Sequence, residues 1–154
     1  MPAPWRRLAS WWDRYQAWRF GAIDPKARLG IRGEQAAARW LRRSGLTIVA
    51  HGESDRGGEI DLIAVDRRRK TVIFVEVKTL ATSKPGHPAE RVDENKQARI
   101  TRAALRYLQR HQLLGVRCRF DVVAVWWVGE TPQPQKIEHY PGAFEAVGVD
   151  GFYS

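Results

Sequence analysis

The chain has 154 residues, a length that suits one domain with a real hydrophobic core. Its 26 Lys and Arg residues outnumber 17 Asp and Glu residues, and the formal net charge of +9 favours a polyanionic partner such as nucleic acid or an acidic membrane surface. A single cysteine excludes an internal disulfide framework, and no apolar run approaches the length of a membrane span.

The first segment of the chain is rich in tryptophan and arginine. In WRRLASWWDRYQAWRF the aromatic residues fall at helical spacing with arginines between them, which predicts a short amphipathic helix, followed by a linker from Gly21 to Gly30. The opening lacks the continuous apolar core of a signal peptide, so we expect a cytoplasmic protein without stable membrane insertion. We divide the chain into this segment at 1–29, a folded domain at 30–131 and a mostly irregular tail at 132–154.

The folded domain shows alternating helix and strand patterns. Periodicity, capping residues and turn formers predict the order helix, three strands, helix, strand. Two hairpin-linked strands followed by a crossover helix indicate an α/β fold, with a small mixed central sheet flanked by helices. The predicted elements are a helix at 33–44 closed by Gly45, strands at 46–50, 59–66 and 71–78, a loop at 79–92, a helix at 93–111 capped by Asp93, and a strand at 118–128.

The hairpin EIDLIAVDRRRKTVIFVEVK carries acidic residues where a strand pair does not favour them. With the turn at 67–70, antiparallel pairing sets Asp61 opposite Glu76, and two carboxylates roughly 5 Å apart repel by about 3 kcal/mol at an effective dielectric of about 20. A Mg²⁺ ion would relieve this repulsion, because it takes oxygen ligands from one or two carboxylates and keeps waters that can act as nucleophiles. The same register pairs Val65 with Val72, Ile63 with Phe74 and Glu59 with Lys78, and it puts Lys78 on the face of Glu76.

A simpler interpretation stays open for each residue of this hairpin. A carboxylate at a strand end is commonly a solvated edge charge, and Glu59 with Lys78 can be a plain cross-strand ion pair. The joint pattern is more informative than any single residue. A Gly-Gly turn, E-I-D, an apolar strand and E-V-K in one pairing register favour a functional site.

Four segments, GEQAAARWL, GGEIDLIA, FVEVKT and FDVVAV, together resemble the YraN-like family of bacterial proteins. That family is similar in motif and sheet topology to archaeal Holliday-junction resolvases and to the wider PD-(D/E)XK nucleases, and the resemblance covers residues 30–128. It implies a restriction-endonuclease-like fold with Mg²⁺ or Mn²⁺ as cofactor, although some members of this superfamily have lost catalysis. Ile60 replaces the proline of the motif name and directly precedes the acidic residue Asp61.

The resemblance also implies roles for individual residues. Asp61, Glu76 and Glu34 correspond to metal ligands, together with the backbone carbonyl of Val77. Lys78 corresponds to the residue that positions the attacking water or stabilises developing charge. Without the resemblance, Glu34 would be explained as an acidic residue in a first helical turn, where the helix dipole favours it.

The second predicted helix offers a surface for nucleic acid. Its basic residues recur at spacings of three and four, which forms a row suited to tracking a phosphate backbone. Related nucleases often place a polar residue at the position of Gln97 to touch phosphate or metal, and a routine surface glutamine is the equal alternative. The candidate nucleic-acid-binding residues are Lys96, Gln97, Arg99, Arg102 and Arg106, with Arg110 extending the row.

The sequence therefore favours a nucleic-acid-binding protein that hydrolyses phosphodiester bonds with a divalent metal, on DNA rather than RNA. One alternative is a catalytically silent nucleic-acid-binding member of the fold. Another is a membrane-surface or protein-interaction factor that acts through the N-terminal Trp/Arg-rich helix. The analogy with junction resolvases implies a homodimer and branched DNA. We expect Asp121 to be a turn or edge residue, with a supporting role beside the site residues as the alternative, and Cys118 to pack as a small apolar residue.

Overall fold

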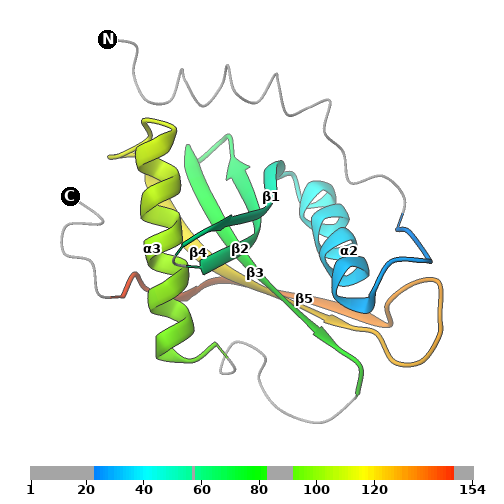
Figure 1. The fold of residues 1–154 in the computed structure, drawn as a ribbon. Helices are drawn as coiled ribbons and strands as arrows, with labels where there is room; N and C mark the ends of the chain where they lie inside the picture. The colour runs from blue at the N-terminus through cyan, green and yellow to red at the C-terminus, as the bar shows by residue number, and fades with distance from the viewer. Residues whose placement is uncertain (1–22, 57, 83–91, 148–154) are drawn as a thin grey trace.

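The computed structural model describes residues 23–56, 58–82 and 92–147, which form a mixed five-stranded sheet with helices on it (Figure 1). The predicted N-terminal helix lies outside the described residues. The strands follow one another in chain order across the sheet; β3 and β4 are parallel, and every other neighbouring pair is antiparallel. The elements are α2 (Leu29–Arg43), β1 (Thr47–Asp55), β2 (Gly58–Asp66), β3 (Thr71–Leu80), α3 (Glu94–Arg110), β4 (Arg117–Trp126) and β5 (Lys136–Phe144).

The predicted α/β architecture and the element order as far as β4 are confirmed. The helix α3 is the crossover between parallel strands β3 and β4, which cannot be joined by a tight turn. The carboxylate of Asp93 accepts the backbone N–H of Lys96 at 2.8 Å, so the predicted cap of this helix is present. This order is consistent with the small restriction-endonuclease-like fold.

The prediction of a mostly irregular tail is wrong for β5. This strand pairs with β4 alone and closes one edge of the sheet, with Val123 opposite His139. Pro141 and Gly142 are among the residues that suggested an irregular tail, but an edge strand tolerates proline because it does not need every N–H for pairing. The register of the β4–β5 ladder shifts between Phe120 and Val122, so the pairing is bulged at this point.

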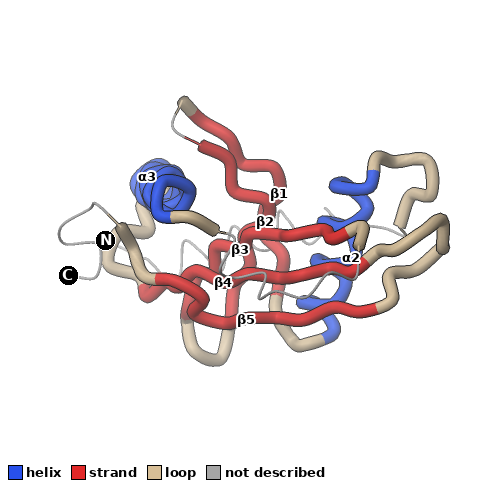
Figure 2. The backbone as a smooth tube through the Cα atoms, turned by 90° about the horizontal axis from the view of Figure 1, so that it is seen from below, coloured by secondary structure: helices blue, strands red, loops and turns tan. Residues whose placement is uncertain are grey.

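Two other boundaries differ from the prediction. Helix α2 begins at Leu29, inside the segment predicted as a linker, and β1 continues to Asp55, beyond the predicted end at Ala50. The extension of β1 pairs with the start of β2, so the two strands form a hairpin that projects from the rest of the sheet (Figure 2). Backbone pairing rather than apolar side chains therefore decides the length of β1.

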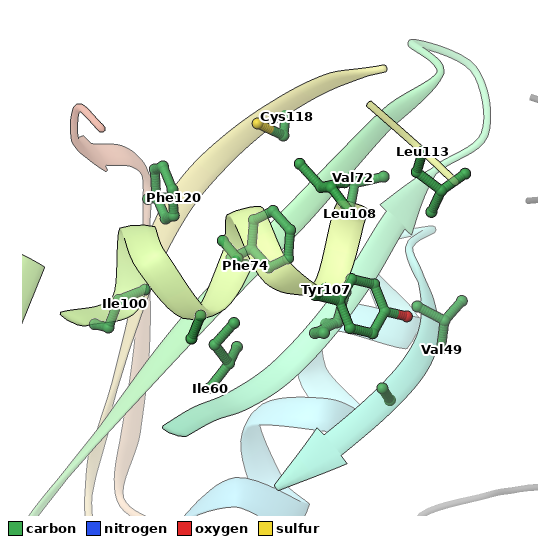
Figure 3. Packing of buried hydrophobic residues seen from close by; sticks show 14 of the residues in the cluster. Val49, Ile60, Val72, Phe74, Ile100, Tyr107, Leu108, Leu113, Cys118 and Phe120 are labelled. Carbon is green, nitrogen blue, oxygen red and sulfur yellow. The ribbon is translucent and has the colours of Figure 1, made fainter. Parts of the chain in front are cut away.

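The sheet separates two apolar layers. One layer lies under α3, where Phe74 contacts Tyr107 and Phe120 (Figure 3), and Cys118 is buried in it as expected. The other lies under α2 and includes the fully buried Trp127. From Thr71 to Glu76 the strand β3 is buried on both faces, which is typical of a strand in the middle of a covered sheet. Within the described residues, no helix is long and apolar enough to span a membrane.

Candidate active site

The predicted hairpin register is confirmed in its apolar part and changes at its open end. Val65 lies opposite Val72 and Ile63 opposite Phe74, but the β2–β3 ladder ends at Leu62. The ladder therefore includes neither of the two predicted pairs at the open end, Asp61 with Glu76 and Glu59 with Lys78. At this end β2 is paired with β1 alone, and Glu59 lies opposite Ser54.

The Asp61 side chain replaces the missing ladder contact. Its Oδ2 accepts the backbone N–H of Val77 at 2.8 Å, which holds the carboxylate against β3 beside Glu76. Burial is the main cause that raises the pKa of Asp61 to about 8, and the nearby Glu76 and Glu34 add to it, although the Val77 hydrogen bond acts in the opposite direction. Asp61 is thus a carboxyl group that keeps its proton near neutral pH unless a cation joins it.

Glu76 is the most enclosed acidic group of the site. Its side chain is 5% exposed, and Oε1 lies 3.4 Å from Nζ of Lys78, two residues along the same face of β3. Nζ of Lys96 contacts the same oxygen. The buried carboxylate is therefore compensated by two ammonium groups, one from its own strand and one from α3.

The position of Lys96 differs from its predicted place in the basic row of α3. The Asp93 cap sets the first turn of α3 over the end of β3, and Lys96, three residues later, points at Glu76. Burial lowers the pKa of Lys96, but the hydrogen bonds to Glu76 and Lys78 outweigh it and raise the pKa. Burial and the hydrogen bond to Lys96 lower the pKa of Lys78. The Asp93 cap indicated where α3 begins, but no signal in the sequence indicated that Lys96 contacts Glu76.

Glu34 reaches the same cluster from α2. Gly33 makes this approach feasible, because a β-carbon at that position would lie 1.8 Å from Oγ1 of Thr79 at the end of β3. Burial raises the pKa of Glu34, and the charges of Glu59 and Glu76 raise it further. The helix begins at Leu29 and has no acidic residue in its first turn, so the helix-dipole explanation for Glu34 is wrong.

The remaining predicted nucleic-acid-binding residues lie on α3 and differ in their contacts and in how far their side chains are exposed. The side-chain amide of Gln97 donates to the carbonyl of Val92 at 2.8 Å, so it helps to hold the entry into the helix. Arg99 and Arg102 are exposed and Arg106 is half-buried. Gly58 lets β2 pack close to this helix, since a β-carbon there would lie 3.1 Å from the carbonyl oxygen of Arg99.

Arg110, the last residue of the predicted basic row, is paired with an acidic residue of the protein. Its guanidinium lies 3.7 Å from the Glu53 carboxylate on the β1–β2 hairpin, so its charge is partly offset within the protein. Arg99 and Arg102 lie in the N-terminal half of the row, nearest the carboxylate cluster of Glu34, Asp61 and Glu76, and their side chains are exposed. This arrangement leaves Arg99 and Arg102 as the residues of α3 best placed to meet a phosphate backbone.

The donor set suits a hard divalent cation. Carboxylate oxygens are the preferred protein ligands of Mg²⁺, which needs only one or two of them because it keeps several waters. Among the described residues, no group of three or more acidic, histidine or cysteine side chains is arranged so that it could hold a metal ion. The ammonium group of Lys96 contacts the Glu76 carboxylate and offsets its charge. The backbone carbonyl of Val77 stays a predicted ligand.

A second polar cluster contradicts the expectation for Asp121. This residue is completely buried rather than a turn or edge residue. Arg119 binds both of its carboxylate oxygens, His139 Nε2 lies 2.6 Å from Oδ2, and the Gly142 N–H donates to Oδ1 at 2.9 Å. Burial raises the pKa of Asp121, but the hydrogen bonds from His139, Arg119 and Gly142 outweigh it and lower the pKa below its ordinary value. The sequence analysis missed this cluster because it did not predict β5, which supplies His139 and the Gly142 N–H.

Comparison with known proteins places this site in a family. Residues 33–125 match the uncharacterised protein family UPF0102, a stretch that contains every acidic and basic residue of the carboxylate cluster. A UPF0102 protein of Rhodopirellula baltica is 65% identical over 147 residues, covering 96% of this chain and 86% of the relative. One of Geobacter sulfurreducens is 44% identical over 117 residues, covering 76% and 88%, and one of Myxococcus xanthus is 41% identical over 128 residues, covering 83% and 98%. The chain therefore belongs to the UPF0102 family.

Proposed function

We propose that this protein is a divalent-metal-dependent endonuclease that hydrolyses phosphodiester bonds in DNA. The observation that carries the proposal is the meeting of Asp61, Glu76 and Glu34, from three different elements, with the amino groups of Lys78 and Lys96. Glu76 is buried, and the pKa values of Asp61 and Glu34 are raised by burial and by neighbouring carboxylates, which is typical of a functional site. The similarity to PD-(D/E)XK nucleases in motif and element order supports the same assignment.

Asp61 and Glu76 would hold the cation, with Glu34 on the side of α2. When bound, Mg²⁺ or Mn²⁺ supplies a Lewis acid for the phosphate and makes a coordinated water easier to deprotonate. The hydrogen bond from the Val77 N–H orients the Asp61 carboxylate before any ligand arrives. Because a cation favours the charged form of a carboxyl group, its binding would remove the proton from Asp61.

Lys78 would act on the phosphate and its attacking water. Its ammonium lies on the face of Glu76, where negative charge develops as the phosphate is attacked. Burial and the neighbouring Lys96 amine both lower the pKa of Lys78, so its amino group is more readily neutral, and available to take up a proton, than that of an ordinary lysine. Charge stabilisation and proton uptake by Lys78 would lower the free energy of the transition state more than they would strengthen substrate binding.

Lys96 would take the place of the cation while the site is empty of metal. Its contact with Glu76 offsets the repulsion among the carboxyl groups, which otherwise destabilises the closed arrangement. A divalent cation competes with this ammonium for the same oxygen. Once displaced, Lys96 lies at the start of α3, next to the exposed Arg99 and Arg102, and can join them in holding the phosphate backbone.

The test is cleavage of linear, flapped and four-way DNA substrates with Mg²⁺ or Mn²⁺. Wild type should cleave at least one substrate, and Asp61→Asn should not. Lys78→Met should lose most cleavage while its DNA affinity stays within about threefold of wild type, because the lysine acts mainly in the transition state. Arg28→Met, on an exposed residue before α2, is the matched control and should cleave normally. The preference for branched DNA and a homodimer stay predictions that the same panel and sedimentation would examine.

The second candidate is a nucleic-acid-binding protein without catalysis. It keeps the exposed arginines of α3 and the net charge of +9 but makes no use of the acidic cluster. DNA binding by wild type without cleavage of any substrate would assign this function instead. A membrane or protein partner for the N-terminal helix is a separate proposal that concerns residues outside the described part of the chain.

A further inference from the structure

The end of the molecule opposite the carboxylate cluster is strongly basic. Three segments meet there: the end of α2, the turn between β2 and β3, and the start of β4. In the sheet Thr71, which follows the turn, lies opposite Asp66 on β2 and next to Arg117 on β4. Strand β1, which follows directly after α2, begins opposite Val65. These segments occupy the upper part of Figure 1. We name this surface the basic pole and define it by Arg42, Arg43, Arg67, Arg68, Arg69, Lys70 and Arg117.

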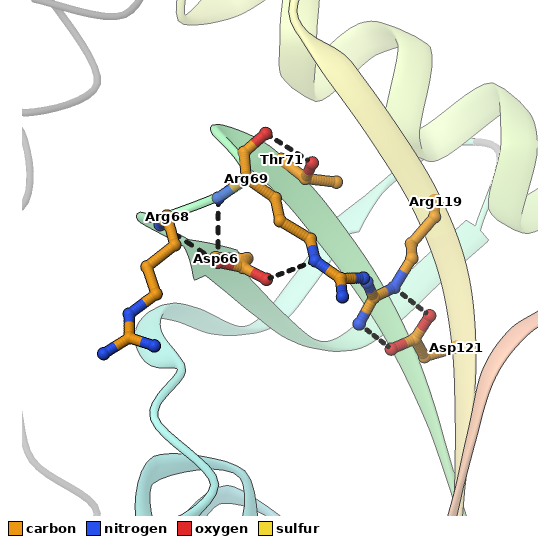
Figure 4. Close-up of polar contacts among 6 residues, drawn as sticks. All are labelled: Asp66, Arg68, Arg69, Thr71, Arg119 and Asp121. Carbon is orange, nitrogen blue, oxygen red and sulfur yellow. Dashed lines mark hydrogen bonds and ion pairs between the residues drawn. The ribbon is translucent and has the colours of Figure 1, made fainter.

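The basic pole concentrates the charge of the chain. Its segments contain seven basic residues and one acidic residue, Asp66, an excess of six, while the whole chain has an excess of nine. Nearby Arg119 adds no net charge, because Asp121 binds it through both carboxylate oxygens (Figure 4). Like charges gathered in this way repel one another, and a polyanionic partner offsets that repulsion.

Asp66 is used to build the turn rather than to neutralise the pole. Its Oδ1 accepts the backbone N–H groups of Arg68 at 3.0 Å and Arg69 at 3.1 Å, while Oδ2 lies 4.0 Å from Nε of Arg69. The Arg69 side chain is 73% exposed, and Arg68 extends away from the other residues in Figure 4. The turn is therefore held by its backbone, and its basic side chains face solvent.

The position of the pole relative to the carboxylate cluster suggests a linear partner. From Thr71 to Lys78, β3 spans about 23 Å at 3.3 Å per residue. A DNA duplex rises 3.4 Å per base pair, so this distance corresponds to about seven base pairs. Helix α3 covers a similar length, from Lys96 at the cluster to Arg110 in its last turn, and presents Arg99 and Arg102 between them.

We propose that the basic pole is a second contact surface for the phosphate backbone of DNA, about seven base pairs from the bond at the carboxylate cluster. The inference rests on the proposed function for the identity of the polyanion. Seven cations on three segments exceed what a single small anion can contact.

The experiment measures duplex DNA affinity against salt concentration in EDTA, where cleavage cannot occur. Arg68→Gln/Lys70→Gln/Arg117→Gln removes three pole charges. Lys26→Gln/Arg28→Gln/Arg56→Gln removes three exposed charges elsewhere and is the matched control. Each phosphate contact contributes about 0.9 to the slope of log affinity against log salt, so the pole variant should lower the slope magnitude by two to three and the control by less than about one. Equal losses in the two variants, or no DNA binding by wild type, overturn the proposal.

Two further measurements separate this proposal from the catalytic one. At saturating DNA the pole variant should cleave at the wild-type rate, while Asp61→Asn should lose cleavage and keep the wild-type salt slope. Normal salt slopes without any cleavage would remove the nuclease assignment and leave the pole intact. Stronger binding of wild type to phosphatidylserine vesicles than to DNA, with the same loss in the pole variant, would assign the surface to membranes and overturn the proposal. Thermal unfolding of each variant checks that it is folded.

Discussion

The carboxylate of Asp61 accepts the backbone N–H of Val77 at the point where the β2–β3 ladder ends. A side chain of one strand thus satisfies a backbone donor of the next, and the strands can diverge without leaving that donor unpaired. The divergence opens space at the end of β3, where Glu76, Lys78 and Lys96 lie. The same contact therefore supports the local fold and orients a candidate metal ligand.

Substitution of Asp61 should separate its structural contact from its charge. Asp61→Asn keeps an oxygen that can accept the Val77 N–H, so its metal-free stability should equal or exceed that of wild type. Asp61→Ala leaves this half-buried donor unpaired and should cost about 1–3 kcal/mol relative to Asp61→Asn. Urea unfolding in EDTA measures the difference. Both variants should lose Mn²⁺ binding by calorimetry, and undiminished binding would remove Asp61 from the metal site.

The metal-free protein should become less stable as pH rises. Folded Asp61 keeps its proton until about pH 8, whereas its ordinary pKa is 3.8, so the folded state binds more protons than the unfolded state between these values. Stability from this residue is therefore greatest below pH 3.8 and is lost as pH rises toward 8. Urea midpoints at pH values across this range should fall more steeply for wild type than for Asp61→Asn. Parallel curves for the two proteins would contradict the raised pKa.

Removal of the Lys96 charge should strengthen metal binding. Lys96→Met keeps the apolar stem but deletes the ammonium that contacts Glu76, so a divalent cation no longer competes for that oxygen. We expect Mn²⁺ affinity to rise about tenfold, or ~1.4 kcal/mol, and metal-free stability to fall because the carboxyl groups repel one another. Arg102→Met, an exposed residue of the same helix, controls for net charge and should change neither quantity. Weaker Mn²⁺ binding by Lys96→Met would instead show that the lysine supports the metal site.

The Asp121 cluster should contribute to stability and not to cleavage. Asp121→Asn removes the charge that Arg119 and His139 surround in a fully buried position, and we expect a loss of about 2–4 kcal/mol by urea unfolding. Glu130→Gln, on an exposed residue, should change stability by less than about 0.5 kcal/mol. Because the pKa of folded Asp121 is lowered, its contribution is present above pH 3.8 and is lost as pH falls below that value. Lost cleavage in folded Asp121→Asn would place the cluster in the mechanism.

The sequence alone determined the parts that depend on local pattern. The two continuous apolar runs and the RRRK turn between them set the hairpin register, so Val65 lies opposite Val72 as predicted. The Asp93 cap set the start of α3, and the spacing of the E-I-D and E-V-K motifs around the turn indicated that Asp61 and Glu76 lie near each other. These features depend on residues close together in the chain.

Tertiary structure decided which distant residues meet. Lys96 contacts Glu76 only because the α3 crossover returns over the end of β3, and Glu34 reaches the cluster because Gly33 allows close packing on Thr79. The β5 strand has weak apolar alternation, so only its pairing with β4 identified it and enclosed Asp121. The spacing of residues along the chain carries little information on such contacts, because they depend on how the helices pack on the sheet and on which strands pair within it.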